Sequence, residues 1–273
     1  MQQTEYVKNK KEAAKVSVVR KEYFEEFSSL LVEYGKLKRD SVFVDVPCGT
    51  GEMTKTILKK SVGKKAYLID INSEMIKVAE KFVLGQSPNS ICKVGDAGDI
   101  GAIVSEKVDT VFCLNGFHIY FDRKEEFLKG VHKILKPEGI FIFDVSTQGI
   151  DDKLSKDFLK IEAEVISRLA RKNGIAYTLP RWPDKRLLNT YRELVMKQGF
   201  FIEKTVTIDT WKPIDEVIKN TVSIPGRLRA RLPGISDALR ISMYTEATRI
   251  AKKRTGITMI KHTRVFFIAK KKK

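Results

Sequence analysis

The stretch that decides the fold reads Val42-Phe43-Val44-Asp45-Val46-Pro47-Cys48-Gly49-Thr50-Gly51. Apart from one acid, its opening residues are β-branched or aromatic, which is typical of a buried strand. Pro47 and Gly49 end this run, and residues 54–60 after the turn have a helical pattern. Glycines at a strand-to-helix turn let the backbone approach a ligand, and the start of the helix presents free N–H groups. The stretch therefore predicts a strand that leads into a ligand-binding turn.

Further apolar runs alternate with helical patterns on the C-terminal side of this stretch. We expect strands at residues 66–69, 91–94, 108–114 and 140–143, and helices at 73–82 and 124–135. Strands that are apolar throughout and alternate with helices indicate a parallel sheet that is covered on both faces. The sequence thus predicts a doubly wound, Rossmann-like α/β domain.

The rest of the chain suggests further parts around this domain. Residues 16–34 have one apolar helical face, residues 201–211 and 258–269 look like strands, and the helical segment between them is rich in arginine and interrupted by prolines. We expect four parts: an N-terminal helical segment covering the site (1–40), the α/β domain (41–211 with 258–269), a basic helical cap inserted over the mouth of the sheet (212–257) and a solvated lysine tail (270–273).

The formal net charge of +17 is concentrated in the last part of the chain. Residues 151–273 carry 28 Lys and Arg against 13 Asp and Glu, whereas residues 41–150 carry 14 of each kind. Such an excess attracts anionic partners. Arg227, Arg229 and Arg231 alternate within it, and they form either a solvated basic face or an anion site.

Composition excludes several other classes. No apolar run approaches the ~18 residues of a membrane span, and the Lys-rich start does not look like a signal peptide, so we expect a cytoplasmic protein. The three cysteines, Cys48, Cys92 and Cys113, lack the paired spacing of a zinc or redox site. The carboxylates and histidines do not cluster at ligand spacing either, so we expect no metal.

A second acid, Asp70, ends the second expected strand. An acid at this place is spaced to bind the two hydroxyls of a ribose, which alone is equally consistent with a dinucleotide site. However, the third glycine of the dinucleotide pattern is missing, with Thr54 or its neighbours in its place. Asp45 would also repel a pyrophosphate, whereas it suits a positively charged amino group. These two details favour a ligand with a cationic end.

Residues 45–51 resemble motif I of the S-adenosylmethionine (SAM)-dependent methyltransferases, with Pro47 where the family usually has glycine. The resemblance continues in order through Gly95-Asp96-Ala97, through residues 108–115 and through residues 135–142. Over residues 42–145 the chain is therefore similar to class I methyltransferases of the small-molecule type. The resemblance implies a seven-stranded sheet, mostly parallel with an antiparallel last strand, SAM as cofactor and S-adenosyl-L-homocysteine as product.

The resemblance also assigns residues to the cofactor. Asp45 would bind the amino group, Asp70 the ribose, and Asp96 with the backbone N–H of Ala97 the adenine. Ile71 would pack on the adenine face. The full set of expected cofactor-binding residues is Asp45, Pro47, Gly49, Gly51, Asp70, Ile71, Asp96, Ala97 and Asn115.

The methyl acceptor is less well specified. His118 follows the fourth expected strand and is the candidate for a catalytic or orienting role, with a place in the pocket wall as the plainer interpretation. The candidate acceptor contacts, each of which is equally consistent with ordinary core packing, are Tyr23, Phe117, Trp182, Trp211, Arg227 and Tyr244.

Three functions remain open at this point. The first is methyl transfer to O, N or C of a small anionic or lipophilic acceptor. The second is a tRNA or rRNA methyltransferase that uses the basic C-terminal region, although residues 109–115 lack the Asn-Pro-Pro-Tyr pattern of base-amino methylases. The third is a non-catalytic SAM-binding subunit. Peripheral contact with an anionic membrane is a further expectation from the charge.

Overall fold

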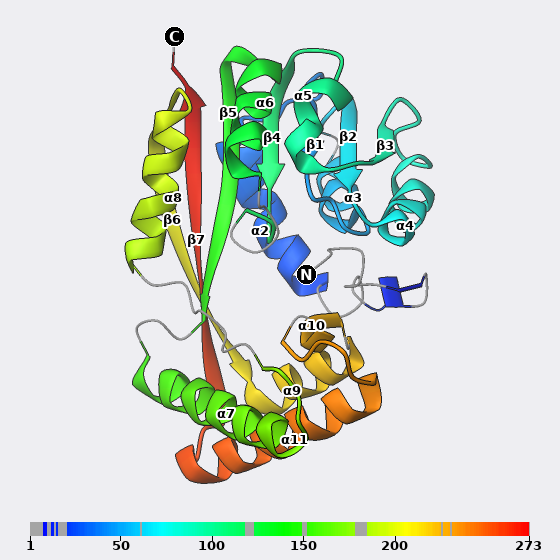
Figure 1. Cartoon of the computed structure of the whole chain (residues 1–273). Helices are drawn as coiled ribbons and strands as arrows, with labels where there is room; N and C mark the ends of the chain where they lie inside the picture. The colour runs from blue at the N-terminus through cyan, green and yellow to red at the C-terminus, as the bar shows by residue number, and fades with distance from the viewer. Residues whose placement is uncertain are drawn as a thin grey trace. The chain divides into compact units, whose positions relative to one another are not determined.

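The computed structural model describes residues 8–9, 12–13, 15, 21–60, 62–117, 123–148, 152–177, 185–224, 226–229 and 231–272. These residues form two compact units (Figure 1). The unit that we call the sheet unit comprises the described residues of Val7–Val145, Arg186–Val206 and Val265–Lys273. The helical unit comprises those of Ser146–Lys185 and Thr207–Arg264.

Seven strands form one sheet in the order β3-β2-β1-β4-β5-β7-β6. They are β1 (Val42–Asp45), β2 (Lys65–Asp70), β3 (Ile91–Val94), β4 (Val108–Cys113), β5 (Leu135–Gln148), β6 (Phe200–Pro213) and β7 (Met259–Lys271). The pairs from β3 to β5 are parallel, and the β5-β7-β6 end is antiparallel. This arrangement confirms the predicted fold.

The register brings the ends of the central strands together. Asp45, the last residue of β1, lies opposite Leu68 of β2 and Phe112 of β4. The chain crosses from β3 back past β1 to β4, so the strand order reverses between β1 and β4. Parallel α/β sheets bind their ligands at the carboxyl ends of the strands beside such a reversal. The fold therefore points to the turn after β1.

Helices of the sheet unit flank these strands. They are α2 (Lys21–Tyr34), α3 (Glu52–Leu58), α4 (Ser73–Val83), the short η2 (Ala97–Asp99) and α5 (Ile100–Ile103), α6 (Lys124–Ile134) and α8 (Lys185–Lys197). Asn72 caps α4, because its side chain accepts hydrogen bonds from the N–H groups of Glu74 and Met75. Packed aromatic rings fill the core, and Phe143 stacks on Phe267 with ring centroids 4.8 Å apart.

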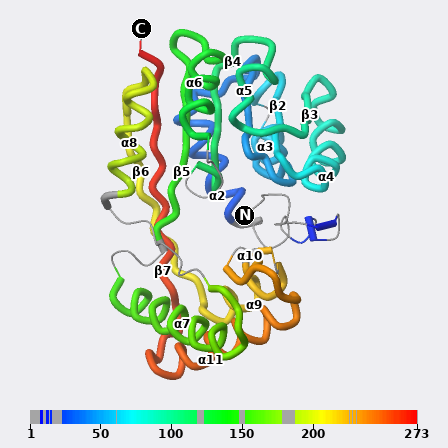
Figure 2. Tube along the Cα trace, viewed as in Figure 1, coloured from blue at the N-terminus to red at the C-terminus, as the bar shows by residue number. Residues whose placement is uncertain are grey.

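The helical unit contains α7 (Lys153–Lys172), α9 (Ile214–Ser223), α10 (Gly226–Arg229) and α11 (Asp237–Thr255). Ile166 of α7 shares a buried core with Met243 and Ala247 of α11. The domain boundaries thus differ from the expected ones. We expected α7 to belong to the α/β domain, but it packs with the helices of residues 212–257. β5, β6 and β7 run from one unit into the other (Figure 2). None of the described helices is long and apolar enough to cross a membrane.

The lysine tail also differs from the expectation. β7 continues to Lys271, so the run is part of the sheet up to that residue. Lys270 forms an ion pair with Glu203 of β6. The Nζ of Lys271 donates to the carbonyl of His132 at 2.9 Å. Lys270 and Lys271 therefore help to hold β7 in place. Their partners, Glu203 and the carbonyl of His132, are far from them in the sequence, so the local sequence does not predict these contacts.

Candidate active site

Asp70 joins the end of β2 to the glycine turn after β1. Its Oδ2 accepts from the N–H of Gly49 at 2.9 Å, and its Oδ1 accepts from the N–H of Asn72 at 2.9 Å. Burial raises the pKa of this carboxyl to about 6. Each carboxylate oxygen has a second lone pair, so the group can still accept from ligand hydroxyls. The geometry is suited to the predicted ribose contact.

Asp45 lies at the end of β1 and is only 3% exposed. Its Oδ2 accepts a hydrogen bond from the hydroxyl of Thr54 at 2.7 Å. Burial, reinforced by the charge of Asp70, raises the pKa of Asp45 to about 7. An ionised carboxylate in this place is stabilised by a nearby cation. The site therefore favours a ligand that brings positive charge next to Asp45. The contact with Thr54 is not signalled by the sequence pattern.

The two glycines of the turn have different roles. Both adopt the left-handed region, with φ of 55° at Gly49 and 74° at Gly51. A Cβ added to Gly51 would come within 3.0 Å of the Cβ of Ala79, so this glycine allows the turn to pack on α4. A Cβ added to Gly49 would meet nothing within 4 Å. The backbone at Gly49 thus borders open space, beside the carboxylate of Asp70, where a ligand can approach.

Asn115 follows β4 and links the turn region to two further elements. Its backbone is left-handed, with φ of 54°. Its N–H donates to Asp144 Oδ1 at 2.6 Å, and its Nδ2 donates to the hydroxyl of Tyr23 at 2.8 Å. Tyr23 comes from α2, and Asp144 is a fully buried residue of β5. Three elements therefore meet at the carboxyl end of β4.

Asp144 is a site residue that was not predicted from the sequence. The available signal is the one that identified Asp70, namely a carboxylate directly after an apolar run, here residues 140–143. A buried carboxylate needs hydrogen-bond donors, and the N–H of Asn115 supplies one of them. This bond ties the residue after β4 to β5, so Asp144 positions a residue of the candidate site.

Gly116 lies against the turn after β1. A Cβ added there would lie 2.3 Å from Cδ and 2.7 Å from Cγ of Pro47, which is far inside van der Waals contact. The close approach explains why a glycine follows Asn115, and it makes Pro47 a packing surface for the end of β4.

Gly116→Ala is expected to destabilise the protein by roughly 1–3 kcal/mol, because the added methyl group overpacks the contact with Pro47. Denaturant unfolding measures this change. Gly85→Ala is the matched control, since a Cβ at Gly85 meets nothing within 4 Å and should leave stability nearly unchanged. Equal stability of the two variants would contradict the proposed contact.

The turn after β3 brings a third acid to the same edge of the sheet. Asp96 caps η2 by accepting from the N–H of Gly98 at 2.6 Å. Nη1 of Arg123 lies 3.8 Å from Oδ1 of Asp96, and its Nη2 lies 3.1 Å from Oδ1 of Asp99. Arg123 is therefore a counter-ion that the two acids share, and the sequence did not predict it. Ala97 is buried beside it. Because β3 neighbours β2, these residues lie next to Asp70 and Ile71 along the carboxyl edge.

The expected acceptor contacts have different positions. Tyr23 lies at the carboxyl end of β4, as described above. Phe117 is fully buried, with its ring 4.6 Å from that of Phe143, so it belongs to the core and not to a pocket wall. Trp211, 51% exposed, and Tyr244, buried against α7, belong to the helical unit. Outside the described residues lie His118, Trp182 and the side chain of Arg227.

Arg229 and Arg231 fit neither of the two interpretations that the sequence left open, a solvated basic face or an anion site. Arg229 is 2% exposed, and its Nε donates to Asp237 at 3.1 Å. Arg231 donates from both terminal nitrogens to the two carboxylate oxygens of Glu162, each at 3.2 Å. Buried guanidinium groups need such partners. The two arginines therefore hold the helical unit together and form neither a solvated face nor an anion site.

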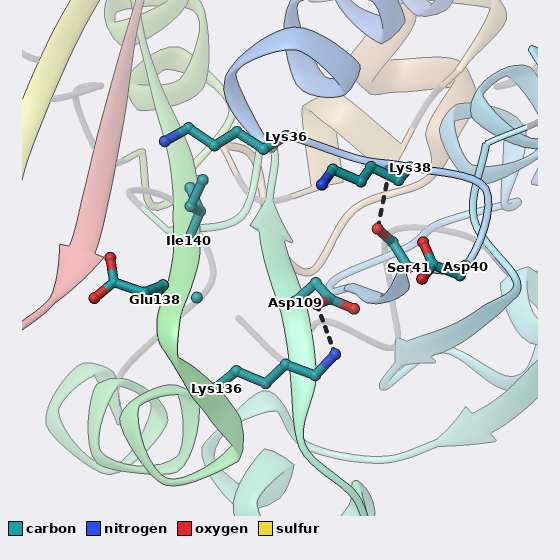
Figure 3. A pocket seen from close by; sticks show the side chains of 10 residues that line it. Lys36, Lys38, Asp40, Ser41, Asp109, Lys136, Glu138 and Ile140 are labelled. Carbon is teal, nitrogen blue, oxygen red and sulfur yellow. Dashed lines mark hydrogen bonds and ion pairs between the residues drawn. The ribbon is translucent and has the colours of Figure 1, made fainter.

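A pocket of about 320 Å³ lies at the opposite edge of the sheet (Figure 3). It is bordered by Lys38 and Ser41 before β1, and by Asp109 and Lys136 near the starts of β4 and β5. Asp109 accepts from the N–H of Val42 at 2.8 Å and pairs with Lys136 at 2.7 Å. These contacts fasten the beginnings of the strands, away from the carboxyl edge where the acids gather.

Comparisons with known proteins agree with this geometry. Residues 44–143 match the family model described as a methyltransferase domain. The chain is 27% identical over 172 residues to the malonyl-[acyl-carrier protein] O-methyltransferase of Halalkalibacterium halodurans, covering 61% of each. It is also 27% identical over 116 residues to the enzyme of the same name from Priestia megaterium, covering 42% of this chain and 40% of that one. The chain thus spans about three fifths and two fifths of these relatives.

A solved structure shows the same fold. The SAM-dependent methyltransferase from Thiobacillus denitrificans, in complex with S-adenosyl-L-homocysteine, superposes with a TM-score of 0.56 at 17% identity, covering 90% of this chain and 91% of that one. The segment that matches the family model runs from β1 into β5 and contains the glycine turn, Asp45, Asp70 and Asp96. Over residues 44–143 the chain is therefore similar to the methyltransferase domain family, and its sheet has the fold of a SAM-dependent methyltransferase.

Proposed function

We propose that this protein transfers the methyl group of SAM to the carboxylate of a small acyl acceptor. The observation that carries the proposal is the buried acidic pair at the ends of β1 and β2, Asp45 and Asp70, together with the open backbone at Gly49, which Asp70 contacts. Both acids have raised pKa values, to about 7 and about 6, and a cationic ligand offsets that cost. SAM has such charge, because it carries an ammonium and a sulfonium group.

The residues fit the cofactor part by part. Asp45 would hold the ammonium group, Asp70 the ribose hydroxyls, and Asp96 with the N–H of Ala97 the adenine. When bound, SAM supplies a methyl group on a positively charged sulfur, which is already activated for attack. The protein's own task is then to orient the acceptor in line with that methyl group.

Tyr23 is the residue that we assign to the acceptor side. Its hydroxyl accepts from Asn115, whose backbone is held by Asp144. This chain of hydrogen bonds fixes the phenol at the carboxyl end of β4, where it can limit how an acceptor enters. The assignment keeps the sequence-based role of Tyr23 and adds Asp144 as its remote support.

We infer the class of methyl acceptor from the names of the curated relatives. Two curated relatives are named for O-methylation of a malonyl group on an acyl-carrier protein. A carboxylate is ionised near neutral pH, so this nucleophile arrives without a proton and needs no general base. By analogy, we assign this chain a free carboxylate on an acyl thioester.

Methyl-labelled SAM tests the proposal. The protein is incubated with malonyl-pantetheine, malonyl-loaded carrier protein, free malonate and bulk tRNA in separate reactions. We expect base-labile label, diagnostic of a methyl ester, on a malonyl thioester. Label in tRNA alone would replace the proposal by the RNA alternative, and absence of label from every carboxylate would reject the acceptor class.

A further inference from the structure

The solvent face of α7 carries a row of charges that the function above does not use. The exposed charged residues, three or four positions apart along the helix and therefore on one face, are Lys153, Lys156, Lys160, Glu164, Arg168, Arg171 and Lys172. We call these residues the α7 row. Opposite to them, Phe158, Val165 and Ile166 are buried in the core of the helical unit. At 1.5 Å per residue, the row extends over about 30 Å.

The basic residues of the row differ from three other cations of the helical unit. Arg229, Arg231 and Lys252 all have acidic partners. Within the described part of the chain, none of the six basic side chains of the α7 row forms an ion pair or a side-chain hydrogen bond. Of the acids beside the row, Asp157 is half-buried, and Asp152 caps the helix by accepting from the N–H of Ser155 at 2.6 Å.

Helix stability does not explain the row. Arg171 and Lys172 lie in the last turn, where cations interact favourably with the helix dipole. Lys153 and Lys156 lie at the other end, where cations are unfavourable, and the acid nearest to that end in sequence, Asp152, is the N-cap and interacts with Lys156. Lys153, Lys156 and Lys160 also lie three or four residues apart and repel one another, with the half-buried Asp157 as one negative charge among three positive ones. An anionic partner would relieve these repulsions.

We propose that the α7 row docks an acidic acyl-carrier protein, the partner that presents the acyl acceptor. This inference rests on the proposed function for the identity of the partner. The position of Glu164 favours a protein over a uniform polyanion. Glu164 interrupts the basic row at its middle, so RNA or an anionic membrane would meet a repulsive charge there. A folded acidic protein can place a donor or a base opposite it.

The test is binding of purified carrier protein, followed by fluorescence anisotropy at about 0.1 M salt. The triple variant Lys153→Glu, Lys156→Glu, Lys160→Glu should bind roughly 10- to 100-fold more weakly than the parent. The matched control reverses three exposed lysines of the sheet unit, Lys59, Lys81 and Lys129, and should change binding less than about threefold. Equal loss in both variants, or loss in neither, would overturn the docking site.

Unfolding cannot account for the expected loss. Lys153→Glu and Lys156→Glu place acids in the first turn of α7, where they interact favourably with the helix dipole. Lys160→Glu lies four residues before Glu164, and this repulsion offsets part of that gain, so the melting temperature of the triple variant should stay within a few degrees of the parent's.

A second comparison separates the partner classes. Glu164→Lys should leave carrier-protein binding unchanged or weaken it, but it should tighten binding to bulk tRNA and to vesicles with anionic lipid. Tighter binding of the parent to tRNA or vesicles than to carrier protein, increased further by Glu164→Lys, would replace the proposed partner.

Methyl transfer to malonyl-pantetheine distinguishes this inference from the proposed function. The triple variant should retain the parent's rate with this small acceptor, which has no protein to dock. If the parent itself transfers no methyl group to any malonyl thioester, the proposed function fails. The binding experiment would still decide whether the α7 row recognises an acidic protein.

Discussion

Asp70→Ala is expected to weaken SAM binding by at least about 100-fold while the protein remains folded. The substitution removes the charged acceptor for two ribose hydroxyls, and hydrogen bonds to charged groups contribute about 1.5–3 kcal/mol each. It also releases the N–H of Gly49, which Asp70 now holds at 2.9 Å, so the glycine turn loses its support from β2. Isothermal titration calorimetry measures the affinity.

The control for Asp70 lies at the opposite edge of the sheet. Asp109 also accepts from a backbone N–H, that of Val42 at 2.8 Å, but it borders the pocket at the strand starts. Asp109→Ala should lower stability and leave SAM affinity within about threefold of the parent. Unchanged SAM affinity in Asp70→Ala would refute the cofactor assignment.

Asp45→Asn is expected to make the ligand-free protein more stable and SAM binding weaker. Burial raises the pKa of Asp45 from 3.8 to about 7, so the folded protein holds this proton more tightly than the unfolded chain. The corresponding stability is fully present below about pH 4 and is lost as the pH rises through about 7. Asn carries no charge to desolvate, so at about pH 8 the variant should gain up to about 4 kcal/mol.

The pH dependence of SAM binding provides the second part of this experiment. The ammonium group binds the ionised form of Asp45, whose pKa is about 7 in the ligand-free protein. Affinity of the parent should therefore fall about tenfold from about pH 8 to about pH 6. Asp45→Asn should bind at least about tenfold more weakly at about pH 8 and show little of this slope. A flat profile for the parent would contradict the role of Asp45.

The central strands are predictable from the sequence because a strand that is buried on both faces needs apolar residues at nearly every position. The run at residues 66–69 has no charged residue, and those at 42–46 and 108–114 are apolar except for Asp45 in the first and Asp109 and Thr110 in the second. A strand that is covered on both faces requires such a nearly continuous apolar run. The cap of α4 at Asn72 is equally local, since the donors that it satisfies lie two and three residues away. Both features depend on residues that are close together in the sequence, so the sequence shows them directly.

The candidate site is predictable only in part. Asp45, Asp70 and Asp96 each end or follow a strand at the same sheet edge, so their proximity follows from topology. Thr54 and Asp144 are different, because their importance depends on which group faces them in the folded chain. Asp144 lies 29 residues from its partner Asn115, and no periodic pattern reports such a pairing.

The arginines of the C-terminal region also form a contact that the sequence does not predict. The acid that follows Arg231 in the sequence, Asp237, pairs with Arg229, whereas the partner of Arg231, Glu162, lies 69 residues earlier. The boundary of the helical unit cannot be predicted from the sequence either, because it depends on contacts between distant segments. α7 has an ordinary amphipathic pattern, and only the contact with α11 shows which core its apolar face joins.

The division of the chain into units has a consequence for protein engineering. The helical unit comes from separated segments, and three strands carry the backbone from one unit to the other. A chimaera made by exchanging residues 212–257 alone would strip Ile166 and Ala170 of their partners on α11. Exchange of the helical unit between homologues therefore requires crossover points inside β5, β6 and β7, so that α7 and α11 are exchanged together.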